Sequence, residues 1–289
     1  MSDWRYEFTG DPACDFTMNV LVDGSSYAAH RRPFFRGLHH IVIAKFDDAN
    51  VFVFDVLRRT VSAVVTQAVA LDRDFWEGTV LPLIVGVLGA AIKVLPVHCA
   101  CLSIDSQGLL IAGVSGSGKS TLSVALAQAG LTFLSDDWTY ISSIERVLIA
   151  HGMSAPIKLL PDAVAHFPSI LPQPLKRTLN GEFAYELHPE KAMGLTVERV
   201  CEPRWLVFPE RGELLESELI PLPTSHIRAY LEENVEVLPP QLVRAEQERQ
   251  HLISKLSELP AWRFQYRGTP QFAAGELIRL LANGKRIAA

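Results

Sequence analysis

The chain has 289 residues, a formal net charge of −5 at pH 7 and 48% hydrophobic residues. This length and apolar content suffice for one large domain, or for a large and a small one, with a substantial hydrophobic core. The slightly acidic balance argues against a nucleic-acid-binding protein, which is usually basic. Four cysteines are too few for a disulfide scaffold. Cys99 and Cys101 form a C-x-C pair, but the second cysteine pair that a structural zinc site needs is missing.

The N-terminal segment, residues 1–78, alternates short β-like runs with turn signals. The runs 16–22, 39–46 and 51–57 are rich in β-branched and aromatic residues. The pattern predicts a small, mostly β N-terminal domain over residues 1–78 and a larger domain over residues 79–289. Two roles are open for the small domain, the binding of an acceptor peptide by strand addition and assembly with other chains.

The start of the chain is polar and lacks the apolar core of a signal peptide. The most apolar run, residues 80–92, is 13 residues long and contains one proline and two glycines. Because a bilayer-spanning helix needs about 20 apolar residues, this run predicts a buried helix instead. We therefore expect a cytoplasmic protein of bacterial type that contacts neither a membrane nor nucleic acid.

The predicted larger domain continues with two short strands, 98–105 and 108–114, followed by a helix and a further strand at 131–138. Residues 152–181 hold five prolines and predict an irregular, loop-rich stretch. The last elements are predicted as a strand at 197–210, a strand and helix at 218–233, an amphipathic helix at 239–259, a strand at 261–268 and a final helix at 269–283.

A complete Walker A motif, G-x-x-x-x-G-K-[ST], runs from Gly113 to Ser120 between an apolar strand and a helix. Its glycines let successive N–H groups turn toward phosphate oxygens, and the helix N-terminus adds partial positive charge. Lys119 is suited to neutralise the β- and γ-phosphates, and the Ser120 hydroxyl to complete a Mg²⁺ shell. We therefore predict ATP and Mg²⁺ as cofactors. The predicted nucleotide-binding residues are Gly113, Val114, Ser115, Gly116, Ser117, Gly118, Lys119, Ser120 and Thr121.

Two adjacent carboxylates, Asp136 and Asp137, follow Lys119 by 17 and 18 residues. One helix and one return strand fill that gap, so the pair is expected at a strand end beside the phosphate loop. Neighbouring residues on a strand point to opposite faces. One carboxylate could therefore hold Mg²⁺ while the other accepts the proton of an incoming hydroxyl. His98 starts the preceding strand and could tune an aspartate or touch the transferred phosphate.

The order of His98, the phosphate loop and the Asp-Asp pair resembles the HPr kinase/phosphorylase family over residues 97–140. The P-loop domain of that family is of the phosphoenolpyruvate-carboxykinase type. The resemblance implies an α/β fold with such a P-loop kinase core, preceded here by the small β domain. It implies a catalytic set of His98, Lys119, Asp136 and Asp137, in which Asp137 accepts the proton and Asp136, with Ser120, serves the metal.

One departure from that family lies at residues 156–170, where an LEIRG-like segment with a metal-site glutamate is replaced by PIKLLPDAVAHFPSI. Short segments such as KLLPD and LPAWRFQY are similar instead to serine kinases of ribosomal-peptide maturation, including the kinases of lasso-peptide precursors. Lys158 lies in the replaced segment and is the first candidate for the acceptor or phosphate side. The other basic candidates are Lys176, Arg177, Arg204 and Arg211.

The sequence thus favours ATP- and Mg²⁺-dependent phosphorylation of a serine hydroxyl on a peptide or small protein. Three alternatives stay open. A small-molecule kinase usually has its loop near the N-terminus, whereas 112 residues precede Gly113 here. The missing LEIRG-like segment argues against HPr kinase/phosphorylase activity itself. The complete set of reactive residues argues against a non-catalytic binding subunit that uses ATP only as a switch. The family resemblance also suggests a homo-oligomer.

Overall fold

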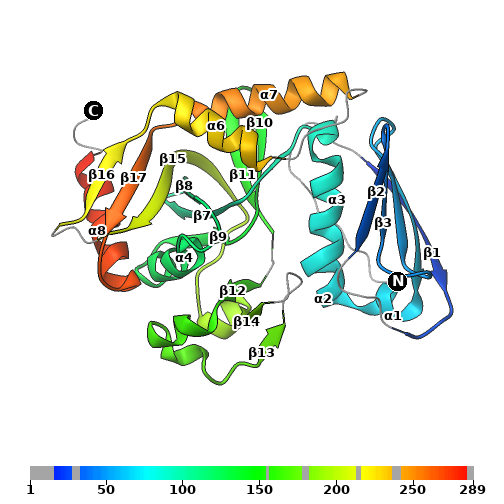
Figure 1. Ribbon diagram of the computed structural model, residues 1–289, viewed down its shortest axis with the longest axis horizontal. Helices are drawn as coiled ribbons and strands as arrows, with labels where there is room; N and C mark the ends of the chain where they lie inside the picture. Colours follow the sequence, from blue (N-terminus) through cyan, green and yellow to red (C-terminus); the bar gives the residue numbers. More distant parts are fainter. Residues whose placement is uncertain are drawn as a thin grey trace.

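The computed structural model shows a mixed α/β chain built on three sheets, with helices between and around them. In Figure 1 a five-stranded sheet stands at one end, and helix α3 (Leu81–Leu88) separates it from the large sheet. The mixed α/β class agrees with the prediction from the sequence. The structure describes residues 16–27, 33–153, 156–177, 182–212, 216–235 and 242–284.

The five-stranded sheet contains the N-terminal strands in the order β1-β5-β4-β3-β2, with β1 parallel to β5 and the other neighbours antiparallel. Side-chain alternation buries Phe52 and Phe54 on one face, against the helices that follow. The predicted runs 16–22, 39–46 and 51–57 overlap three of its strands. The strands are β1 (Thr17–Asp23), β2 (Phe34–Leu38), β3 (Ile41–Lys45), β4 (Val51–Asp55) and β5 (Thr60–Thr66).

A helical stretch follows this sheet; it contains the helix predicted at residues 80–92 and begins before it. It comprises α1 (Gln67–Leu71), α2 (Arg73–Phe75), the π turn η2 (Trp76–Val80), α3 and the 3-10 turn η3 (Gly89–Ile92). The side chain of Asp72 accepts from the Phe75 amide and so starts the helix seven residues earlier than the apolar run indicates. Within the described part of the chain, Arg73–Ile92 is the one helix long and apolar enough to cross a membrane, with 20 residues and a mean hydropathy of 1.8.

This helical stretch packs within the protein. Val80, Ile84 and Leu88 are fully buried in the cluster that also holds the inner face of the five-stranded sheet. The predicted boundary between residues 78 and 79 falls inside the stretch, so no break in secondary structure marks that boundary. The division into two domains stays a prediction.

The large sheet has nine strands, and its central parallel strands β8, β15 and β17 set the position of the site. Since these strands run the same way, their carboxyl ends meet at one edge, where α/β sheets bind ligands. The strands are β6 (Leu95–Val97), β7 (Cys99–Ile104), β8 (Gln107–Ala112), β9 (Thr132–Ser135), β10 (Thr139–Ile144), β11 (Val147–Gly152), β15 (Val200–Arg211), β16 (Glu218–Pro221) and β17 (Ala261–Tyr266).

Helices cover both faces of the large sheet. One face packs against α4 (Lys119–Gln128) and α8 (Pro270–Gly284), the other against α6 (Thr224–Asn234) and α7 (Val243–Ser257). Consecutive residues of β8 alternate between the two cores: Leu109 and Ile111 face α4, while Leu110 and Ala112 face α6 and α7. The predicted amphipathic helix at 239–259 corresponds to α7, and its residues 239–241 lie outside the described residues.

A third, three-stranded sheet corrects the prediction that residues 152–181 are irregular. It has the order β12-β14-β13 and lies beside α4 (Figure 1). Two of the five prolines of this segment begin the 3-10 turns η4 (Pro161–Ala165) and η5 (Pro168–Ile170), which is a position that tolerates a missing N–H. Its strands are β12 (Ile157–Leu159), β13 (Leu175–Arg177) and β14 (Phe183–Leu187), and α5 (Pro189–Met193) follows. Residues 154–155 and 178–181 lie outside the described residues.

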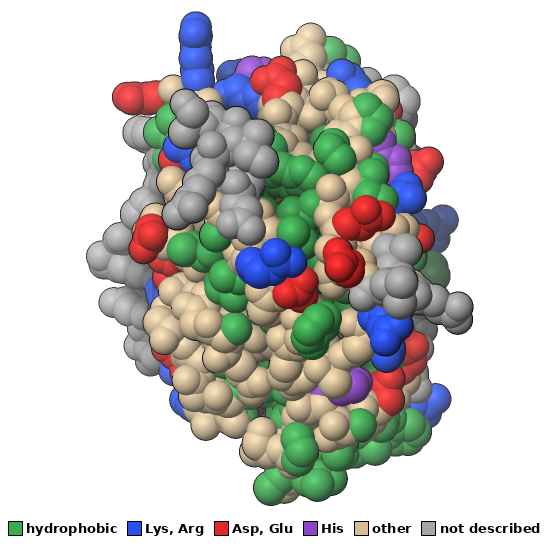
Figure 2. Space-filling view, turned by 90° about the vertical axis from the view of Figure 1, so that its left-hand side faces the viewer, with side chains coloured by type: hydrophobic (Ala, Val, Ile, Leu, Met, Phe, Trp, Pro, Cys, Tyr) green, Lys and Arg blue, Asp and Glu red, His purple; other side chains and the backbone are tan. Residues whose placement is uncertain are grey.

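Hydrophobic side chains are exposed on this third sheet and its turns. In Figure 2 they gather at the lower end of the molecule, which carries the three-stranded sheet in Figure 1. The exposed large hydrophobic residues of the segment are Leu160, Leu171, Leu175 and Phe183, which are 45%, 60%, 46% and 56% exposed. Such clusters on protein surfaces commonly mark contacts with other molecules.

Candidate functional site

The loop between β8 and α4 has the backbone of a phosphate-binding loop. Gly113, Gly116 and Gly118 adopt φ angles of 144°, 79° and 88°, in the region that favours glycine. A side chain on Gly113 would also press against the Ser117 hydroxyl. That hydroxyl is buried and has no hydrogen-bond partner within the described structure. The loop therefore presents an unsatisfied polar atom and the free N–H groups of the α4 N-terminus on its inner side.

Lys119, the first residue of α4, is 7% exposed and folds back over the loop. Its Nζ donates to the carbonyl oxygens of Gly113 and Val114, at 2.9 and 3.1 Å. Burial lowers the pKa of Lys119, while the nearby carboxylates of Asp137 and Asp136 act in the opposite direction. The lysine thus links the loop electrostatically to the Asp-Asp pair.

Asp136 follows β9 directly and points inward, where it is 6% exposed. One carboxylate oxygen accepts from the Ser123 hydroxyl at 3.3 Å, and the other from the backbone N–H of Lys158 at 3.3 Å. The side chain of Ser120 also lies close to this carboxylate and acts to lower its pKa. Burial, together with the charge of Asp137, raises the pKa of Asp136 to about 6. Asp136 therefore joins α4 to β12 and lacks a full compensating positive charge.

Asp137 faces the other way and is half-exposed. Its Oδ1 lies 3.0 Å from Nε2 of His98, and its Oδ2 lies 3.7 Å from Nζ of Lys158. The hydrogen bond with His98 and the charge of Lys158 lower the pKa of Asp137, against the effect of burial. Because an ionised carboxylate can only accept, Nε2 of His98 must carry the proton in this bond. The Trp138 ring lies against that of His98, with centroids 5.3 Å apart.

The structure thus brings together five residues that the sequence singled out, namely His98, Lys119, Asp136, Asp137 and Lys158. They come from the start of β7, the start of α4, the end of β9 and the middle of β12. The contact of Lys158 with both aspartates uses two different groups, its backbone N–H and its ammonium. The chemical roles assigned to these residues stay predictions.

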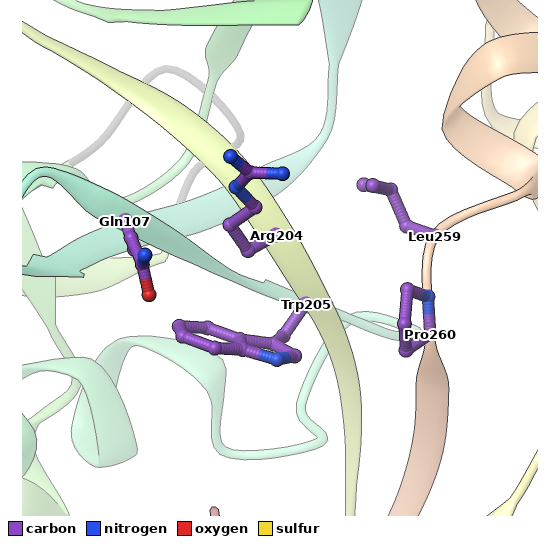
Figure 3. A pocket seen from close by; sticks show the side chains of 5 residues that line it. All are labelled: Gln107, Arg204, Trp205, Leu259 and Pro260. Carbon is purple, nitrogen blue, oxygen red and sulfur yellow. The ribbon is translucent and has the colours of Figure 1, made fainter. Parts of the chain in front are cut away.

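The other basic candidates lie apart from this cluster or have other partners. Arg204 pairs with Glu202 at 2.9 Å and lines a hollow between the start of β8, the middle of β15 and the start of β17 (Figure 3), away from the edge where the phosphate loop begins. Lys176 pairs with Glu186 at 3.4 Å. Arg211 ends β15 on the phosphate-loop edge and donates to a backbone carbonyl at 3.5 Å. The hollow is lined by Gln107, Arg204, Trp205, Leu259 and Pro260.

Three residues at the site escaped the sequence reasoning. Tyr230 of α6 contacts both the phosphate loop and the backbone of His98 through its hydroxyl. Ser123 supports Asp136 from α4, and Trp138 covers His98. The sequence could have pointed to two of them by position. Ser123 lies three residues after Ser120, and Trp138 directly follows the Asp-Asp pair. Tyr230 had no such local signal, because it is 117 residues from Gly113 in the chain.

The oxygen atoms at the base of the loop suit Mg²⁺. This ion usually takes one or two protein oxygens and completes its octahedron with phosphate oxygens and water. The hydroxyl of Ser120 and the carboxylate of Asp136 are such ligands and lie close to each other. A cation there would also supply the positive charge that this buried carboxylate lacks. Groups of three or more His, Cys, Asp or Glu side chains able to hold a metal do not occur in the part of the chain that the structure describes.

Comparison with known proteins adds little to this geometry. No protein-family model matches the chain, and no curated protein matches its sequence. Among solved structures, the Hpr(Ser) kinase/phosphatase from Coxiella burnetii is similar over 67% of this chain and 95% of that chain, with 17% sequence identity and a TM-score of 0.35. A likeness this distant carries no argument about activity or substrate, so the function must be inferred from the site itself.

Proposed function

We propose that the chain is a Mg²⁺-dependent kinase that transfers the γ-phosphoryl group of ATP to a serine hydroxyl of a peptide or small protein. The observation that carries the proposal is the position of Asp137. Its carboxylate has a lowered pKa, is accessible from solvent, and lies next to His98 and Lys158 beside a complete phosphate loop. A carboxylate in that position can accept a proton from a hydroxyl that approaches the γ-phosphate.

On the nucleotide side, the loop amides and the α4 N-terminus would bind the β- and γ-phosphates. Lys119 would release the two loop carbonyls that it now contacts and turn its ammonium toward the phosphate oxygens. The unpartnered Ser117 hydroxyl is one more donor inside the loop. Ser120 and Asp136 would hold Mg²⁺, which, when bound, offsets the charge of the phosphate oxygens.

On the acceptor side, Asp137 would orient the incoming hydroxyl and take its proton late in a loose transition state. Phosphoryl transfer of this kind depends mainly on position and charge, so a weakly basic carboxylate suffices. His98 would act through Asp137, since its Nε2–H fixes one carboxylate oxygen. The ammonium of Lys158 would stabilise negative charge that develops on the transferred group.

Two observations support a peptide or protein acceptor over a small molecule. The side chains of Asp137 and Lys158 are 45% and 44% exposed, whereas small-molecule sites usually enclose most of their ligand. The neighbouring three-stranded sheet and its turns expose the large apolar side chains shown at the lower end of Figure 2. The resemblance of short segments to kinases of ribosomal-peptide maturation suggests, more narrowly, a lasso-peptide precursor as the acceptor.

The experiment is to incubate the full chain with ATP and Mg²⁺ and with serine-containing peptides or, in parallel, small alcohols. Mass spectrometry of the acceptors and measurement of ADP report the transfer, with Lys119→Met as the control that lacks the phosphate-binding ammonium. The proposal predicts Mg²⁺-dependent phosphoserine on peptides. ADP formation with small alcohols alone would favour a small-molecule kinase, and ATP binding without transfer to any acceptor would favour an ATP-switched binding subunit.

A further inference from the structure

The β7–β8 ladder stops where the site begins. Its last pair is Cys99 with Ala112, and the same antiparallel register makes His98 and Gly113 the next partners. The hydroxyl of Tyr230 stands between these two residues. It accepts from the Gly113 N–H at 3.1 Å and lies 3.1 Å from the carbonyl oxygen of His98, to which it can donate. The side chain thus replaces one rung of the ladder by a bridge through its hydroxyl.

Tyr230 is held in this position by its helix and by an aromatic neighbour. Ile227 and Leu231 are buried and fix α6 on the large sheet. The ring of Tyr230 packs edge-on against Phe208 of β15, with centroids 5.0 Å apart. Burial raises the pKa of Tyr230 to about 12, so the hydroxyl keeps its proton at neutral pH and remains a donor.

We propose that Tyr230 is a positioning residue that sets the phosphate loop and His98 relative to each other. The proposal rests on the proposed function, because it assigns the two bridged segments to the nucleotide and to the acceptor. Gly113 leaves the sheet with a φ of 144° and starts the phosphate loop. His98 carries the ring that fixes Asp137. One hydroxyl from α6 therefore joins the two halves of the site through their backbones.

Loss of the hydroxyl has two possible consequences, and both disturb the loop. The Gly113 N–H can bond directly to the His98 carbonyl, which draws the start of the loop toward β7. Otherwise the N–H and the carbonyl lose their partner in a half-buried position, which is unfavourable. In the first case the start of the loop shifts, and in the second it loses a hydrogen bond that holds it.

The test compares Tyr230→Phe, which removes the hydroxyl alone, with the matched control Tyr185→Phe on β14. A fluorescent ATP analogue measures nucleotide affinity, and melting temperature measures stability. We expect nucleotide affinity about ten-fold weaker in Tyr230→Phe, with kcat lowered and KM raised, in a variant whose melting transition shows that it is folded. The control should keep nucleotide affinity within about two-fold of the unaltered chain. The proposal would be overturned if Tyr230→Phe kept both its nucleotide affinity and its kcat within about two-fold of the unaltered chain.

A second variant and a second measurement keep the test decisive. If Tyr230→Phe does not fold, Phe208→Leu loosens the ring and keeps the hydroxyl, and it should weaken nucleotide binding in the same direction. If the unaltered chain binds no nucleotide, the proposed function fails, and hydrogen exchange then tests the bridge separately. The Gly113 amide should exchange about ten-fold faster in Tyr230→Phe, whereas an unchanged rate would show that the hydroxyl does not hold the loop.

Discussion

A buried histidine on the β10–β11 hairpin should make the stability of the fold depend on pH. His151 lies on β11, is 7% exposed, and has its Nε2 2.8 Å from the Ser142 hydroxyl. Burial lowers the pKa of His151 from 6.5 to about 4. The folded chain therefore keeps this ring neutral at pH values at which the unfolded chain binds a proton.

The sign and size of the effect follow from this difference. Because the folded pKa is the lower one, the unfolded state gains protons first as the pH falls, and stability is lost between pH 6.5 and about 4. Each pH unit inside that window costs about 1.4 kcal/mol. Between pH 7.5 and pH 4.5, His151 should thus lower the free energy of unfolding by about 2–3 kcal/mol.

The contribution of His151 is measured by urea denaturation at the two pH values. The unaltered chain is compared with His151→Gln. Glutamine keeps a polar group near Ser142 but does not titrate. Other groups also titrate in this range. The raised pKa of Asp136, for example, makes the folded state more stable as the pH falls. These groups are common to both proteins, so their effects cancel when the two pH-dependent changes are subtracted. The free energy of unfolding should fall by about 2–3 kcal/mol less in the variant. An equal fall in both proteins would refute the reasoning.

Three further predictions concern the site and the sheet behind it. His98→Ala removes the hydrogen bond that lowers the pKa of Asp137, so the acid limb of the pH profile of kcat/KM should move to higher pH. Lys158→Met should reduce kcat about ten-fold in the transfer assay and leave ATP affinity nearly unchanged, since its backbone N–H still holds the buried carboxylate. Gly152→Ala presses a methyl group into a backbone carbonyl of β9 and should cost about 3 kcal/mol in urea denaturation, whereas Gly78→Ala, which meets open space, should not destabilise.

The phosphate loop and the neighbourhood of the aspartates could be predicted because their signals are local. A strand, three spaced glycines and a helix begin and end within residues 107–128. After that helix, one short strand must return the chain to the same sheet edge, which places Asp136 and Asp137 beside the loop. Whether Asp137 accepts a proton and Asp136 holds Mg²⁺ does not follow from this geometry alone.

The features that escaped prediction depend on contacts between distant parts of the chain. The strands of the third sheet are as short as three residues, and the prolines around them give a stronger local signal than the strands do. The helix at Arg73–Ile92 was underestimated because its first turns carry charged residues, and only the Asp72 cap reveals its start. Tyr230 reaches the loop from α6, and no spacing pattern connects it to Gly113.

Asp137→Asn in single-turnover transfer tests whether Asp137 accepts the proton of the acceptor hydroxyl. The amide keeps the size of the side chain but removes its charge and its basicity, and Asp74→Asn on the exposed helix α2 is the matched control. If Asp137 is the proton acceptor, ATP affinity should stay within about three-fold of the unaltered chain, and phosphoryl transfer should be slower by at least about 100-fold. Transfer by Asp137→Asn at the rate of the control would contradict this role.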